Sequence, residues 1–157
     1  MQLANNEELD TFLKIHPSIK MMEVLMIDMN GIIRCKRIPR SEFAELFTEG
    51  LKSPASTVLL NVKGEFCDEL DKADLDGDPD RLIRPIKNTL SIIPWLESET
   101  AQVLSTFTEL NGEPNLFDSR NVLINSLKPL YALGLKLVVA TELEFYLIKS
   151  GDSSRPE

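Results

Sequence analysis

The dipeptide Asn30-Gly31 places the tightest constraint on how this 157-residue chain can fold. It joins two apolar runs, residues 22–27 and 32–38, and a two-residue type I′ turn needs residues that tolerate positive φ. The sequence therefore predicts an antiparallel hairpin with Asn30-Gly31 at its tip. Pro39 has no amide hydrogen to donate to a neighbouring strand, so it is expected to end the second strand.

The pattern around this hairpin predicts two helices and further strands. Apolar residues share one face of a helix over residues 6–15, and Ser41 is placed to cap a second helix that ends at Gly50. Further strands are predicted at residues 57–62, 89–93 and 103–110. A hairpin followed by a helix and more strands is typical of an α+β layer with the helix packed on one sheet face, and it fits a β-grasp domain.

A turn-rich tetrapeptide at residues 111–114 predicts a connection between two parts of the chain. Residues 1–112 are therefore expected to form one domain and residues 113–157 the start of another. The second part is expected to begin with a helix over residues 119–133, with Asp118 at its N-cap.

A strand predicted at residues 135–148, after a helix-closing Gly134, carries Glu142 and Glu144. Side chains alternate along a strand, so both carboxylates point from the same face, with Cα atoms roughly 6–7 Å apart. Two carboxylates at that spacing can each bind a hard cation such as Mg²⁺, with nucleotide phosphates supplying further oxygen ligands. The alternative is a half-buried strand whose solvated face simply carries two glutamates.

Charge and cysteine content exclude several functional classes. A net charge of −8 argues against nucleic acid, because phosphate binding needs clustered Lys and Arg. The short basic cluster within residues 34–40 is interpreted as a solvated hairpin face. Cys35 and Cys67 lack metal-type spacing and are expected to be reduced thiols in a cytoplasmic protein. The acidic N-terminus does not read as a signal peptide, and no membrane association is expected.

Two other features are interpreted as structural. The acidic stretch at residues 68–80 resembles a calcium loop only in part. Alignment on Gly77 puts Lys72 and Ile83 at its first and twelfth positions, where acidic ligands belong. An exposed acidic loop is therefore the preferred interpretation. Trp95 follows a proline and is expected to be a packing anchor rather than a platform for stacking bases.

Four segments resemble motifs of the glutamine synthetase superfamily, in the same order as in that family. Residues 28–39 are similar to its D-x-x-G-x-x-R-G-K-x-x-P hairpin, residues 78–95 to its P-D … T-x-x-x-x-P-W segment, residues 119–123 with Gly134-Leu135 to its D-P-R-x-x-L helix and glycine turn, and residues 142–145 to its Glu-x-Glu-Phe metal strand. The motifs look most like those of the γ-glutamylpolyamine synthetase branch. The resemblance covers about the first third of a family member.

This resemblance implies a β-grasp N-terminal domain of glutamine synthetase type, followed by the first helix and strand of the catalytic domain. It implies an ATP-dependent ligase that forms γ-glutamyl phosphate from glutamate, which an amine or ammonia then attacks. Glu144 would hold the metal nearer the glutamate and Glu142 the metal nearer the ATP phosphates, with Mg²⁺ or Mn²⁺ as the ion. The family also implies a homo-oligomer, a double hexameric ring. The remaining family ligands would follow Glu157, so the chain alone is expected to be inactive.

The resemblance also bears on the acceptor. Ammonia-using members carry an F-D-G-S-S-like segment whose aspartate helps to bind ammonium, whereas the corresponding residues 53–57 contain no carboxylate here. Because ammonium needs a nearby anion for capture and deprotonation, a γ-glutamylpolyamine or putrescine synthetase is expected. The alternatives are a true glutamine synthetase and, from another class, a non-catalytic β-grasp assembly module.

Overall fold

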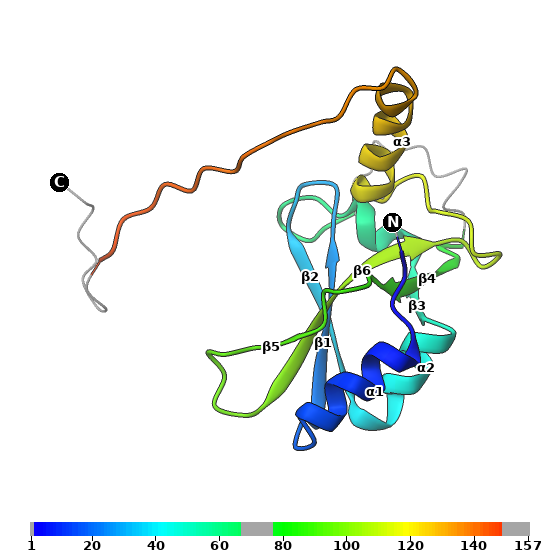
Figure 1. Cartoon of the computed structure of the whole chain (residues 1–157). Helices are drawn as coiled ribbons and strands as arrows, with labels where there is room; N and C mark the ends of the chain where they lie inside the picture. Colours follow the sequence, from blue (N-terminus) through cyan, green and yellow to red (C-terminus); the bar gives the residue numbers. More distant parts are fainter. Residues whose placement is uncertain (1, 67–76, 149–157) are drawn as a thin grey trace.

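The computed structural model describes residues 2–66 and 77–148, and within them the fold centres on one curled, six-stranded mixed sheet (Figure 1). The strand order is β2-β1-β6-β4-β3, and β5 also pairs with β6. β1 and β6 run parallel, and the other pairs run antiparallel. The strands are β1 Met21–Ile27, β2 Ile33–Pro39, β3 Leu51–Pro54, β4 Asp80–Pro85, β5 Ser91–Ile92 and β6 Thr100–Thr108. The α+β class is confirmed, and the β-grasp assignment stays a prediction.

The predicted hairpin is present, but its turn differs from the predicted type I′ turn. Only Gly31 in the loop has a positive φ, 77°, and its amide donates to the Asp28 carbonyl at 3.0 Å. The Asp28 amide in turn donates to the Ile32 carbonyl at 3.0 Å. This is a three-residue loop with glycine in the left-handed region. The Asp28 carboxylate favours it by accepting the amides of Asn30 and Ile32, both at 2.9 Å.

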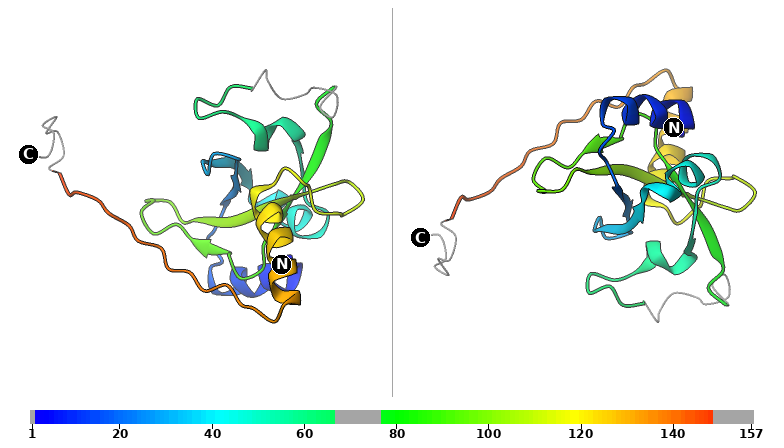
Figure 2. Two further views of the ribbon diagram at one scale, coloured as in Figure 1. Left: turned by 90° about the horizontal axis from the view of Figure 1, so that it is seen from above. Right: turned by 90° about the horizontal axis from the view of Figure 1, so that it is seen from below.

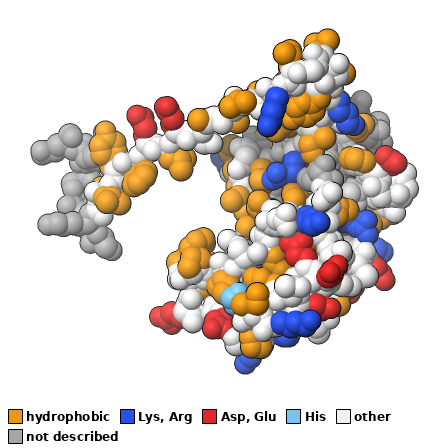
Figure 3. Space-filling model, viewed as in Figure 1, with side chains coloured by type: hydrophobic (Ala, Val, Ile, Leu, Met, Phe, Trp, Pro, Cys, Tyr) orange, Lys and Arg blue, Asp and Glu red, His pale blue; other side chains and the backbone are white. Residues whose placement is uncertain are grey.

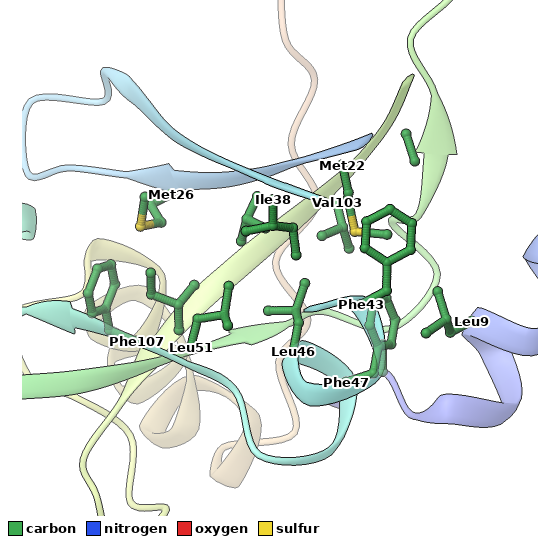
Figure 4. Packing of buried hydrophobic residues seen from close by; sticks show 14 of the residues in the cluster. Leu9, Met22, Met26, Ile38, Phe43, Leu46, Phe47, Leu51, Val103 and Phe107 are labelled. Carbon is green, nitrogen blue, oxygen red and sulfur yellow. The ribbon is translucent and has the colours of Figure 1, made fainter. Parts of the chain in front are cut away.

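Alternation along β1 decides which face of the sheet is buried. Met22, Val24 and Met26 are buried, while the residues between them are only partly buried. Figure 4 shows Met22 and Val103 of β6 beside the buried side chains of α2 (Phe43–Thr48), and Met26 beside Phe107 and Leu51. Full burial of a side chain of this size contributes about 1.5–3 kcal/mol. The core therefore lies between one face of the sheet and α2.

The first helix matches its predicted range. α1 (Asn6–Ile15) begins after Asn5, whose side-chain oxygen accepts a hydrogen bond from the Glu8 amide at 3.1 Å. Its one fully buried residue, Leu9, contributes to the same core as α2. The two helices contact each other, and Figure 1 shows them side by side.

The second helix begins later than predicted. Ser41 lies in a 3₁₀ turn, Arg40–Glu42, and α2 starts at Phe43 without a side-chain cap. The assignment of Ser41 as N-cap is therefore wrong. Arg40 fixes the start of this segment instead, because its amide donates to the Lys20 carbonyl at 2.8 Å and its guanidinium to the Ile19 carbonyl at 2.7 Å.

The strand predicted at residues 57–62 is also wrong. Residues Ala55–Leu59 form a 3₁₀ helix, and the missed strand β3 precedes it. Ala55, Val58 and Leu59 are buried, at the i, i+3, i+4 spacing of a helical face rather than the alternate spacing of a strand. The β-branched residues in this run masked that spacing. The strands predicted at residues 89–93 and 103–110 are confirmed in part, as β5 and β6.

Gly50 follows α2 with a φ of 86°, and a Cβ added there would lie 2.9 Å from the Ile83 carbonyl oxygen. We expect Gly50→Ala to lower the free energy of unfolding by about 2–4 kcal/mol, since left-handed strain and a backbone clash add together. Urea unfolding followed by circular dichroism measures this loss. Gly31→Ala is the matched control, because Gly31 has a φ of 77° but nothing within 4 Å of the added Cβ. Equal losses in the two variants would contradict a role for the close approach to Ile83.

The predicted third helix is present as α3 (Ser119–Ala132), with Asp118 at its N-cap. One Asp118 oxygen accepts the Arg120 amide at 2.8 Å. The other accepts the Thr106 hydroxyl at 2.8 Å and the Phe107 amide at 2.7 Å, both from β6. The start of α3 is therefore fixed to the sheet. Whether a domain boundary falls near residue 112 stays a prediction. No helix in the described part of the chain is both long and apolar enough to cross a membrane.

Gly134 ends α3 as predicted, with a φ of 73° and a Schellman pattern of hydrogen bonds. Its amide donates to the Tyr131 carbonyl at 2.9 Å, and the Leu135 amide donates to the Leu130 carbonyl at 3.2 Å. The strand predicted at residues 135–148, however, is not formed in the structure. Figure 2 shows this segment running away from the sheet in both views.

Candidate functional site

Glu142 and Glu144 lie in the extended segment 135–148, where every residue is exposed. Figure 3 shows acidic and hydrophobic side chains along this segment, outside the body of the molecule. The segment carries large apolar side chains exposed on both sides, including Leu147 at 93% and Val138 at 85%. The predicted strand is wrong for this chain by itself, because a strand needs a partner for its amide and carbonyl groups. None of the described strands supplies one.

The two glutamates have the right chemistry for Mg²⁺ or Mn²⁺ but too few neighbours. Carboxylate oxygens are hard donors that suit such cations, which prefer six ligands. Within the described residues there is no group of three or more His, Cys, Asp or Glu side chains able to hold a metal. The two carboxylates are therefore suitable ligands for Mg²⁺ or Mn²⁺, but a complete site needs further oxygen ligands from other residues or from a bound molecule.

The resemblance motif at residues 28–39 has a clear structural role at the hairpin tip. The buried Asp28 carboxylate forms an ion pair with Arg34 at 2.8 Å, and Arg34 also donates to the Asn61 carbonyl at 3.0 Å. The Met29 amide donates to the Val58 carbonyl at 2.9 Å. The hairpin and the loop after the 3₁₀ helix are therefore held together as one unit.

The other basic side chains near this hairpin also have partners. Arg37 pairs with Glu23 at 2.9 Å, and the Lys36 ammonium donates to the Lys52 carbonyl at 3.3 Å. These contacts support the interpretation of a structural hairpin face rather than an anion-binding site.

Cys35 is an exposed free thiol on β2, and Cys67 lies outside the described residues. Partial burial raises the pKa of the Cys35 thiol, and the nearby Glu23 raises the pKa further, although Arg37 lowers it. The thiol therefore stays protonated at neutral pH, which does not suit a nucleophile. Trp95 is 73% exposed, so its predicted role as a packing anchor is wrong within the described part of the chain.

The predicted acceptor segment, residues 53–57, has a carboxylate beside it that the linear sequence did not reveal. Asp78 accepts the Ser56 amide at 2.9 Å and the Ser56 hydroxyl at 2.7 Å. Ser53 and Thr57 place two more hydroxyl groups in this segment, 3.1 Å apart. The absence of an acidic residue from the segment itself is therefore no argument against capture of an ammonium ion here. The two residues are 22 positions apart, and no local pattern predicts their contact.

The acidic stretch at residues 68–80 is described only from Gly77 onwards, so the expectation of an exposed loop falls largely outside the described residues. Of its acidic members, Asp78 and Asp80 are described and exposed. Asp78 has a φ of 43°, in the left-handed region that aspartate tolerates better than most residues. Its contact with Ser56 gives it a structural role at the start of the 3₁₀ helix.

Comparison with known proteins identifies the family. No protein-family model matches the chain. The chain is 34% identical over 145 residues to gamma-glutamylputrescine synthetase PuuA of Escherichia coli K12, covering 92% of the chain and 30% of that protein. It is 32% identical over 130 residues to a glutamate–isopropylamine ligase of Pseudomonas sp, covering 82% and 28%.

A glutamine synthetase of Mycolicibacterium smegmatis is 26% identical over 150 residues, covering 88% of the chain and 30% of that protein. The chain thus spans less than a third of the length of these relatives. The names of all three describe synthetases or ligases of glutamate or glutamine compounds, and the match extends over most of the chain in each case. The chain belongs to the glutamine synthetase superfamily.

Proposed function

We propose that this chain is the N-terminal part of an ATP-dependent ligase that joins the γ-carboxylate of glutamate to an amine through γ-glutamyl phosphate. The observation that carries the proposal is the 34% identity to a gamma-glutamylputrescine synthetase over 92% of the chain. The Glu142 and Glu144 pair adds the donor chemistry that such a reaction needs. The chain alone, with two candidate ligands in an uncovered segment, is proposed to be inactive.

In this proposal Glu144 holds the metal nearer the glutamate, and Glu142 holds the metal nearer the ATP phosphates. Mg²⁺ or Mn²⁺ supplies neutralisation of charge on the transferring phosphoryl group when bound. Segment 135–148 would form a strand only when neighbouring strands pair with its backbone and other parts of the protein cover its apolar side chains. We therefore propose that residues 113–157 begin a catalytic domain, while residues 1–112 form a β-grasp domain. A double hexameric ring in the cytoplasm is the proposed full-length assembly.

An alkylamine such as putrescine is the proposed acceptor. Putrescine and isopropylamine appear in the names of the relatives at 34% and 32% identity, whereas the glutamine synthetase reported above is at 26%. Ammonia, and so a true glutamine synthetase, is the alternative that Asp78 beside Ser56 favours, since this carboxylate is placed to attract a small cation. A non-catalytic assembly module is the third candidate. The uncovered apolar face of α3, with Val122 and Leu123 exposed, is the observation in its favour.

The acceptor is tested by steady-state kinetics of the full-length protein with ATP, glutamate and either putrescine or ammonium. We expect a higher kcat/KM for putrescine. A higher value for ammonium would instead assign ordinary glutamine synthesis. No phosphate release with either acceptor, in a protein shown to be folded and assembled, would favour the module.

Asp78→Asn separates a structural role from a role in amine binding. Asparagine can keep both contacts with Ser56 but loses the negative charge. If Asp78 attracts the acceptor, KM for the amine should rise about tenfold, because a hydrogen bond to a charged group contributes about 1.5–3 kcal/mol, while kcat changes little. Asp80→Asn is the matched control, since Asp80 is exposed nearby at the start of β4. An unchanged KM in Asp78→Asn would leave Asp78 with its structural role only.

A further inference from the structure

The dipeptide Asn-Gly occurs in two exposed loops of this chain, at Asn30-Gly31 and at Asn111-Gly112, and the two loops share one backbone conformation. In each five-residue loop, 28–32 and 109–113, the amide of the first residue donates to the carbonyl of the fifth, at 3.0 Å and 2.7 Å. The glycine amide donates to the carbonyl of the first residue, at 3.0 Å and 2.9 Å. The two glycines have φ values of 77° and 87°. The loops are therefore a matched pair within one chain.

The side chain of Asn30 is tied to a distant part of the chain. Its Nδ2 donates to the Leu60 carbonyl at 2.6 Å. The amide two residues further on, that of Ile32, donates to the Asp28 carboxylate at 2.9 Å. The Asn30 amide donates to the same carboxylate oxygen, also at 2.9 Å. The Asn30 carboxamide is therefore held by a second loop, while the Asp28 carboxylate fixes the backbone around it.

The side chain of Asn111 is bonded within its own loop instead. The amide two residues further on, that of Glu113, donates to Asn111 Oδ1 at 3.0 Å, and within the described part of the chain Asn111 Nδ2 donates no hydrogen bond. The carboxylate of Glu109, the first residue of this loop, pairs with Arg81 and accepts Asn115 Nδ2 at 2.8 Å. The Asn111 carboxamide is therefore folded over its own loop as an Asx turn. Figure 2 shows the loop that follows β6 protruding from the body of the molecule in both views.

An asparagine that precedes glycine can lose its side-chain amide group without an enzyme. A base removes the proton of the glycine amide, whose nitrogen then forms a bond to the asparagine Cγ. The bond from Cγ to Nδ2 breaks, and Nδ2 takes up a proton and leaves as ammonia. Water then adds to either carbonyl of the cyclic imide and opens the ring, which gives aspartate or isoaspartate. Glycine permits the ring closure because it has no Cβ to obstruct it.

We propose that Asn111 is a site of spontaneous deamidation, and that its contact with Leu60 protects Asn30 from the same reaction. The Glu113 amide is placed to stabilise the negative charge that develops on Asn111 Oδ1 during attack by the Gly112 nitrogen. At Asn30, the leaving nitrogen is bonded to another loop, so the side chain must first break that contact. The proposal goes beyond the proposed ligase function and does not depend on it.

Conversion of Asn111 changes the connection between β6 and α3. Aspartate adds a carboxylate between Glu109 and Glu113, and isoaspartate adds a methylene to the main chain, so the hydrogen bonds that close the loop are expected to break. The chain leads from this loop to Asn115 and Asp118. Because Asp118 joins the start of α3 to β6, isoaspartate at position 111 is expected to loosen that attachment.

The test is incubation of the folded chain in mildly alkaline buffer, followed by tryptic digestion and mass spectrometry against a zero-time sample. Peptide 88–120 contains Asn111 and two other asparagines, which fragment ions distinguish, and peptide 21–34 contains Asn30 alone. We expect Asn111 to convert at least about tenfold faster than Asn30, equivalent to about 1.4 kcal/mol in the barrier. Isoaspartate, labelled by protein isoaspartyl methyltransferase, should form together with aspartate. Aspartate alone would indicate direct hydrolysis and would overturn the proposed imide.

The chain unfolded in guanidinium chloride separates the effect of the fold from that of the local sequence. Without the contacts to Leu60 and Glu113, the two Asn-Gly pairs should convert at similar rates. Asn111→Gln should remove the rapid release of ammonia from the folded chain, whereas the matched variant Asn30→Gln should retain it. Equal rates at the two sites in the folded chain, faster conversion of Asn30, or the same rate ratio in the unfolded chain would each contradict the proposal.

Discussion

Replacing Glu144 by alanine in the proposed full-length ligase is expected to lower kcat by about 100-fold or more. Loss of one carboxylate leaves the charge of the metal–phosphate cluster poorly compensated, and a metal ion contributes several kcal/mol to stabilisation of the transferring group. Circular dichroism of the variant separates this loss of activity from a loss of folding. Phosphate release under saturating ATP, glutamate and amine measures the effect.

Glu113→Ala is the control for this experiment, since it removes the same side chain from an exposed loop and should leave kcat unchanged. Metal dependence adds a second readout. Glu142→Ala and Glu144→Ala should each raise the Mg²⁺ or Mn²⁺ concentration needed for half-maximal activity. A Glu144→Ala enzyme that keeps activity within a few-fold of the parent would rule out the metal assignment.

Asp28→Ala is expected to be strongly destabilising, with a loss of about 3–5 kcal/mol in the free energy of unfolding. The Asp28 carboxylate is buried and accepts two backbone amides as well as the Arg34 guanidinium. Its removal leaves a half-buried cation without its partner and opens the hairpin loop. For a chain of this size such a loss is a large part of the total stability of about 5–15 kcal/mol.

Urea unfolding monitored by circular dichroism suits this measurement, because the single tryptophan, Trp95, is exposed and reports poorly on the core. Asp10→Ala on the exposed side of α1 is the control and should change stability by less than about 0.5 kcal/mol. Asp28→Asn should fall between the two, because asparagine keeps an acceptor for the loop amides but loses the ion pair. A loss below about 1 kcal/mol in Asp28→Ala would show that water replaces the network at little cost.

Short-range signals predicted much of this fold. The Asn30-Gly31 pair located the hairpin, and the apolar spacing of α1, the Asp118 cap and the Gly134 stop located both long helices. These predictions hold because each depends on hydrogen bonds within a few residues. The turn type was mispredicted because the Asp28 side chain, rather than the turn residues themselves, selects the loop conformation.

Long-range contacts were beyond the reach of sequence patterns. The segment at residues 57–62 has strand-like composition, yet burial of Ala55, Val58 and Leu59 makes part of it a 3₁₀ helix. The contact between Asp78 and Ser56 joins residues that no periodicity relates. Both depend on where the chain folds back, which composition does not specify.

The candidate site was predicted by motif rather than by geometry. Glu142 and Glu144 were assigned from the resemblance of residues 142–145 to a family motif, since their spacing alone also fits a solvated strand face, and the structure gives this run no strand to pair with. The alternation that suggested a strand is a property of the sequence, whereas strand formation depends on a partner. The chain is 34% and 32% identical to two relatives over most of its length, and the role of the glutamate pair as metal ligands stays a proposal.

The central claim, that this chain belongs to a glutamate–amine ligase, is tested most directly by product analysis of the full-length protein. Purified protein is incubated with ATP, Mg²⁺, glutamate and putrescine, and γ-glutamylputrescine and phosphate are quantified together. Equal amounts of the two products are expected, and neither product when glutamate is omitted. Folded protein that forms no γ-glutamyl product with putrescine, isopropylamine or ammonium would contradict it.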